Sequence, residues 1–115
     1  MRIVVREVIN DLGDIFEDGQ KVHDLISPVL ARGEEVEVDF EGFRYLCVPL
    51  LNAAIGQLLK DHPKERVKAL LRVQNLDAHY RETVELVIEK SSRYYTEPRY
   101  REAVDRVLAR MFEDQ

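Results

Sequence analysis

Hydrophobic positions along the chain change their spacing several times, and these changes predict the order of its elements. Residues 3–9 are rich in β-branched side chains, and Val36, Val38 and Phe40 alternate with acidic residues, so strands are expected in both segments. A third strand is expected over residues 67–73. Apolar residues three and four positions apart predict helices after each strand. The predicted order is β-α-β-α-β-α-α, an α/β fold in which right-handed crossovers join parallel strands.

The ends of the predicted helices can be placed from capping residues. Asp18 is expected to cap the first helix and Gly33 to follow its last turn. Pro49 suits the first turn of the second helix. Asp77 is expected to cap the third helix, and a break is expected over residues 91–98.

The last predicted helix has the clearest amphipathic pattern, and Thr96 is expected to cap it. Such a stripe is too apolar to leave in water, so it either covers its own domain or pairs with a second copy or a partner. The predicted organisation is one domain over residues 1–95, which the helix of residues 96–115 extends. The candidate interface, with homodimerisation as one outcome, comprises Tyr100, Val104, Val107, Leu108 and Met111.

Composition narrows the classes of function. The 115 residues carry a net charge of −5, which argues against nucleic acid as a partner. A single cysteine, Cys47, excludes an internal disulfide and a site with several thiolates, and the three histidines lack metal-site spacing, so no metal or cofactor is expected. The sequence has neither a signal-like apolar run nor a membrane-spanning one, and a cytoplasmic protein is expected.

The segment DFEGFRYLCVPLLNAAIG resembles the STAS domains of anti-sigma-factor antagonists and, more narrowly, the STAS-like domain family of unknown function DUF4325. The resemblance covers roughly residues 1–95 and is carried by EDGQKVHDLI, VEVDFEGFRYL, LLNAAIGQLL and VQNL. It implies a small STAS-like α/β domain with a mixed or parallel sheet of about three or four strands. It also implies a non-enzymatic regulatory module that binds a partner protein such as a GHKL-type ATPase.

One feature of switching STAS domains is missing from this sequence. Those domains are phosphorylated on a Ser or Thr near the start of the helix after the DFEG-like loop, where Cys47, Val48 and Pro49 stand here. We therefore expect no phosphorylation at this helix. The loop and helix start remain the candidate binding site, which comprises Asp39, Glu41, Gly42, Cys47, Val48, Pro49 and Asn52.

Other interpretations of this segment lead to different functions. Nucleotide or a small anion could bind at the amides of residues 47–51, which would make the domain a ligand sensor. Asp39 and Glu41 could form a catalytic carboxylate pair, but a loop Asp that accepts backbone amides beside a solvated Glu is favoured. Cys47 could be a reactive thiol, but we expect a small buried apolar group. Gly56 is expected to allow close packing of a helix on the sheet.

Overall fold

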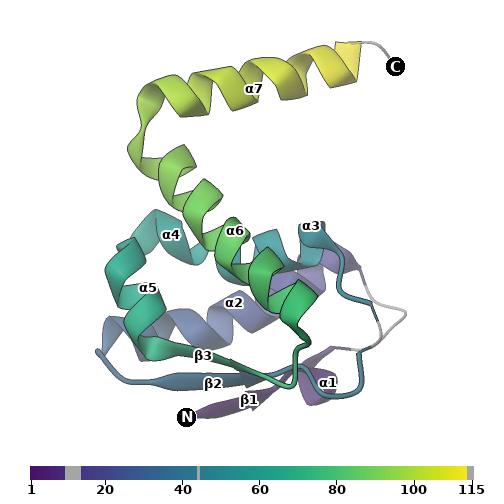
Figure 1. Ribbon diagram of the computed structural model, residues 1–115, viewed down its shortest axis with the longest axis vertical. Coiled ribbons are helices and arrows are strands. Elements are labelled where there is room, and N and C mark those ends of the chain that lie inside the picture. The colour runs from purple at the N-terminus through teal and green to yellow at the C-terminus, as the bar shows by residue number, and fades with distance from the viewer. Residues whose placement is uncertain (10–13, 44, 114–115) are drawn as a thin grey trace.

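The computed structural model describes residues 1–9, 14–43 and 45–113, in which helices cover one face of a small parallel sheet (Figure 1). The three strands have the order β1-β2-β3, and both pairings are parallel. The elements are β1 (Arg2–Val4), α1 (Val5–Val8), α2 (Ile15–Ala31), β2 (Val36–Asp39), α3 (Val48–Leu51), the π-helical turn η1 (Asn52–Gly56), α4 (Leu58–Asp61), α5 (Lys64–Leu70), β3 (Leu71–Gln74), α6 (Ala78–Thr96) and α7 (Pro98–Glu113). The predicted α/β class, the parallel sheet and its strand number are confirmed.

The two faces of the sheet differ in polarity. Ile3, Val36, Val38 and Leu71 are buried beneath the helices. On the other face, the register aligns exposed Arg2, Glu37 and Arg72 side by side across the three strands. The fold is therefore a two-layer arrangement with a charged outer sheet face.

Two of the predicted strands are too long. The chain leaves β1 after Val4 and turns into α1, and the segment before Leu71 is the helix α5. The reason is the length of the central strand, because β1 stops at Val4 opposite the last residue of β2, Asp39, and β3 starts at Leu71 opposite its first residue, Val36. Val67 is fully buried all the same, as a helical residue.

The first long helix begins earlier than predicted and ends where predicted. Asp14, not Asp18, is the N-cap of α2, and its carboxylate accepts hydrogen bonds from two backbone amides of the first turn. Asp18 lies buried inside the helix. Gly33 follows the C-cap with φ of +74°, and its amide and the next one bond to the carbonyls of Leu30 and Val29. This pair of bonds is a Schellman motif, so the prediction for Gly33 is confirmed.

The second helix starts with Pro49 in its first turn, as predicted, and contains one wide turn. At η1 the amide of Gln57 bonds to the carbonyl of Asn52, five residues earlier. Glycines allow η1 to sit between α2 and α6, because a Cβ on Gly19 would lie 2.3 Å from that of Ala53 and one on Gly56 would lie 2.8 Å from Ser91 Oγ. The close approach at Gly56 is thus to helix α6, and the predicted contact with the sheet is wrong.

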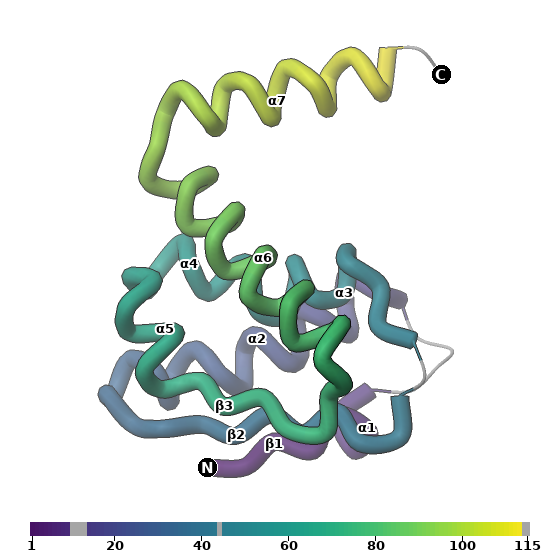
Figure 2. Tube along the Cα trace, in the orientation of Figure 1, coloured from purple at the N-terminus to yellow at the C-terminus, as the bar shows by residue number. Residues whose placement is uncertain are grey.

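The predicted break over residues 91–98 is confined to Glu97, because α6 continues to Thr96 and α7 starts at Pro98. Its N-cap is Asp77, as predicted. Thr96 does not cap the last helix but bonds back to the Ser92 carbonyl within α6. Packing of this stretch of α6 against η1 outweighs the weak helix preference of its serines and tyrosines. Helix α7 then runs across the far end of the molecule, remote from the sheet (Figures 1 and 2).

Within the described residues, no helix has the length and apolarity that crossing a bilayer requires. Among the same residues, no group of three or more His, Cys, Asp or Glu side chains is placed to hold a metal ion.

Candidate functional site

The structure divides the predicted binding residues between two places. Asp39, Glu41 and Gly42 lie at the carboxyl end of β2, whereas the segment from Cys47 to Asn52 forms the start of α3 and η1. The first group belongs to a hydrogen-bonded turn. The second lies at the mouth of a groove.

Asp39 organises the turn after β2. Its carboxylate accepts hydrogen bonds from the Asn75 side chain at 2.7 Å and from the Glu41 amide at 2.9 Å, and it forms an ion pair with Arg2. The hydrogen bonds from Asn75 and Glu41, together with the Arg2 guanidinium, lower the pKa of Asp39 below its ordinary value. Asp39 is buried and Glu41 is exposed. The favoured interpretation of this pair, a loop Asp beside a solvated Glu, is confirmed.

The turn itself requires a glycine. The amide of Phe43 bonds to the carbonyl of Phe40, and Gly42 between them has φ of +91°. Arg6 stacks on the Phe43 ring with its guanidinium carbon 4.9 Å from the centroid, which fastens the turn to α1. These contacts give the turn a structural role.

The start of α3 exposes apolar and thiol groups. Cys47 is the N-cap residue and is exposed, so the expectation that it is buried is wrong. Leu46 takes the buried position instead, and its amide donates to the Tyr80 hydroxyl at 3.3 Å, which turns the following side chain outward. Tyr45 is 85% exposed and Val48 is 50% exposed. We call the surface formed by four exposed residues the front surface: Tyr45, Cys47 and Val48 at the start of α3, and Phe16, 70% exposed, at the start of α2.

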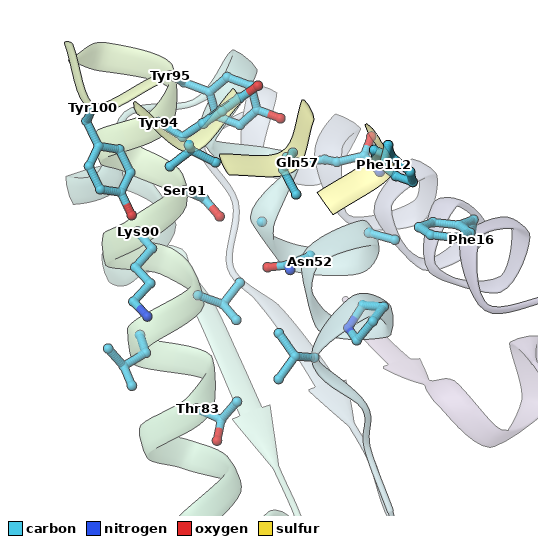
Figure 3. A pocket seen from close by; sticks show the side chains of 18 residues that line it. Phe16, Asn52, Gln57, Thr83, Lys90, Ser91, Tyr94, Tyr95, Tyr100 and Phe112 are labelled. Carbon is cyan, nitrogen blue, oxygen red and sulfur yellow. The ribbon is translucent and has the colours of Figure 1, made fainter. Parts of the chain in front are cut away.

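A groove of about 740 Å³ lies between α6, the α3–η1 segment and α7. Figure 3 shows Thr83, Lys90 and Ser91 along α6 on one side and Asn52 and Gln57 on the other. Its lining is mostly apolar, with a few polar groups. The lining residues are Phe16, Val48, Pro49, Asn52, Ala53, Gly56, Gln57, Thr83, Leu86, Val87, Lys90, Ser91, Tyr94, Tyr95, Tyr100, Val104, Leu108 and Phe112.

The predicted α7 interface contributes to this groove in part. Tyr100, Val104 and Leu108 line it, whereas Val107 and Met111 are exposed beside it. On the other wall, the groove is lined by Val48, Pro49 and Asn52 of the predicted binding site, whereas Phe16 and Leu86 were not indicated by the sequence. Phe16 precedes the predicted start of its helix, and Leu86 stands off the predicted apolar stripe of α6, so only the folded structure brings them to the groove.

The corner between α6 and α7 is held by several contacts. The Arg93 guanidinium stacks 4.1 Å from the Tyr100 ring centroid and pairs with Glu97. The Tyr94 hydroxyl donates to Asp105 at 2.7 Å, and Arg101 stacks on the Tyr94 ring. These contacts fix α7 at a distance from the sheet layer and keep the groove open.

Comparisons with known proteins identify a family and nothing more specific. A family model described as STAS-like domain of unknown function (DUF4325) matches residues 18–81. The matched segment includes α2 from Asp18 onward, all of α3 and the first turn of α6, while Phe16 and α7 lie outside it. No curated protein and no solved structure is significantly similar to the chain.

Proposed function

The chain belongs to the STAS-like domain family DUF4325, and on this premise we propose that it is a non-enzymatic regulatory module that acts by binding a partner protein. The observation that carries the proposal is the front surface. Exposed aromatic and aliphatic side chains gather at the N-terminal ends of α2 and α3, although no core packing requires them there. Aromatic residues exposed together are typical of protein interfaces.

The class of partner follows from the STAS resemblance, which favours a GHKL-type ATPase. The front surface includes the residues that stand in place of the phosphorylated segment of switching STAS domains. Because Cys47, Val48 and Pro49 offer no hydroxyl, binding here does not depend on a phosphate at this helix. The module would then act through its affinity for the partner alone.

The test is direct binding to a purified GHKL-type ATPase from the same genome, measured by calorimetry with and without ATP. Val48→Glu places a charge in the front surface and is expected to weaken binding about tenfold or more. Leu25→Glu is the matched control, since Leu25 is an exposed apolar residue farther along α2. Equal effects of both variants, or stoichiometric phosphate on residues 45–52 after incubation with ATP, would contradict the proposal.

A second candidate function is sensing of a small ligand or nucleotide. The groove favours it, because 740 Å³ lies within the range of small-molecule sites and apolar walls with a few polar groups are typical of them. A rise in melting temperature with one nucleotide, abolished by Asn52→Ala or Lys90→Ala, would support this function. An unchanged melting temperature across a nucleotide panel would reject it.

A further inference from the structure

We propose that the groove binds helix α7 of a second copy of the chain, so that two molecules exchange α7 helices in a symmetric pair. This goes beyond the proposed function and does not depend on it. The first observation is that none of the described residues of α7 is buried. Val107, Met111 and Phe112 are 57%, 60% and 71% exposed.

Helix α7 has too little support from its own chain. It has 16 residues, and most of the stability of helices in proteins comes from packing of an apolar face and not from intrinsic helix propensity. The α7 stripe faces a groove whose opposite wall carries more apolar side chains, and the space between them is open. An apolar surface that fills this space would stabilise both α7 and the opposite wall of the groove.

The corner contacts argue against α7 filling the groove itself. To fold down onto η1, α7 would have to swing about Glu97 and Pro98. That movement breaks the stacking of Arg93 on Tyr100 and the hydrogen bond from Tyr94 to Asp105. The occupant therefore comes from another molecule.

The spacing of the groove-lining residues on α7 matches an antiparallel copy of the same helix. The lining residues Tyr100, Val104, Leu108 and Phe112 are each four residues apart, so their positions are symmetric about Arg106. An antiparallel α7 centred on Arg106 places Tyr100 opposite the partner's Phe112 and Val104 opposite the partner's Leu108. A two-fold symmetric interface needs this kind of self-complementary surface.

Two apolar residues of α7, Val107 and Met111, do not line the groove of their own chain. They are adjacent on the helix to the residues that do, so in the exchanged pair they contact the wall of the partner's groove that lies opposite its α7. That wall includes the exposed side chain of Leu86, together with Phe16 and Val48. One exchanged helix thus covers apolar groups that are exposed in the single chain.

The area is sufficient for a stable pair. A 16-residue helix is about 24 Å long and about 10 Å across. Seating one side of it covers on the order of 400 Å² of helix and a similar area of groove. Each chain both donates a helix and accepts one, so each buries on the order of 800 Å², which is typical of stable interfaces.

Sedimentation equilibrium of the full chain over a dilution series tests the proposal. A dimer is expected, and Leu108→Glu should raise its dissociation constant by about 100-fold or more, because the new charge would be buried against apolar groups. Ala109→Glu is the matched control, since Ala109 is exposed on the same helix and does not line the groove. Circular dichroism of both variants checks that the fold is retained. A monomeric wild type, or a dimer equally affected by both substitutions, overturns the proposal.

Cross-linking tests the antiparallel register. In a Cys47→Ser background, chains with Val104→Cys are mixed with chains with Leu108→Cys and oxidised. The mixture should form a disulfide-linked heterodimer faster than either chain links to itself, because only the mixed pair brings the two Cα atoms within bonding range. Preferential self-linking overturns the register. A groove occupied instead by a small ligand or by a different protein would leave the wild type monomeric and is the same negative result.

Discussion

Substitution of Gly19 by alanine should destabilise the protein although it improves helix propensity. Gly19 lies inside α2, where alanine is more favourable than glycine by about 1 kcal/mol. The new methyl carbon, however, would lie 2.3 Å from Ala53 Cβ and 3.2 Å from the Leu50 carbonyl oxygen. Carbon atoms prefer a separation of about 3.5–4 Å, so α2 and η1 would have to move apart.

The size of the loss follows from two opposing effects. Overpacking a core typically costs about 1–3 kcal/mol, and the upper end applies here because neither Cβ can rotate away. After subtracting the propensity gain, Gly19→Ala should lower the free energy of unfolding by about 1–2 kcal/mol. For a chain of 115 residues this corresponds to a melting temperature about 4–8 °C lower, measured by circular dichroism.

A second substitution tests whether the contact with Ala53 causes the loss. In a chain that also carries Ala53→Gly, the opposing methyl group is gone, and Gly19→Ala should now raise the melting temperature. Gly56→Ala is a milder comparison, because its nearest neighbour is the Ser91 hydroxyl, which can rotate. The reasoning is refuted if Gly19→Ala stabilises the otherwise unchanged protein.

Two further predictions concern single side chains. Burial and, to a lesser degree, Arg66 lower the pKa of His62 from 6.5, so the unfolded chain takes up its proton first, and the free energy of unfolding should fall as the pH drops below about 6.5. His62→Gln should reduce this fall in urea titrations at pH 7 and pH 5; an identical pH dependence in both proteins would contradict it. Cys47 is exposed, so it should react with a thiol reagent in native buffer at a rate close to that in denaturant, and strong protection would show that the front surface is covered.

The sequence was sufficient for the fold class because strand and helix patterns alternate along it. It also located Gly33, Pro49 and Asp77 at helix ends, where local backbone chemistry alone decides the structure. The end of β1 and the start of β3 could not be predicted, because they depend on where β2 ends and begins. The end of β2 is set by the turn from Phe40 to Phe43, a feature of another part of the chain.

The candidate site was predictable only in its parts. The sequence identifies the α3 start and the α7 stripe separately, but nothing in their spacing indicates that they face each other across one groove. The apolar neighbours of Cys47 predict a buried side chain, whereas the thiol is exposed. Since Leu46 occupies the buried position, the direction of the next side chain depended on the path of the backbone into α3.

The wide turn at η1 absorbs one extra residue without turning the helix about its axis. Each residue of an α-helix advances it by about 100°, and η1 holds one residue more than a regular turn. If the same residues formed an uninterrupted α-helix, the part after η1 would be rotated by about this angle relative to the part before it. Either Leu58 and Leu59 would leave the core, or Val48 and Asn52 would turn away from the groove. A chain with one residue deleted at η1 would instead form a regular helix with both parts in their present orientation, so relatives without the extra residue would present the same side of this helix to their partners.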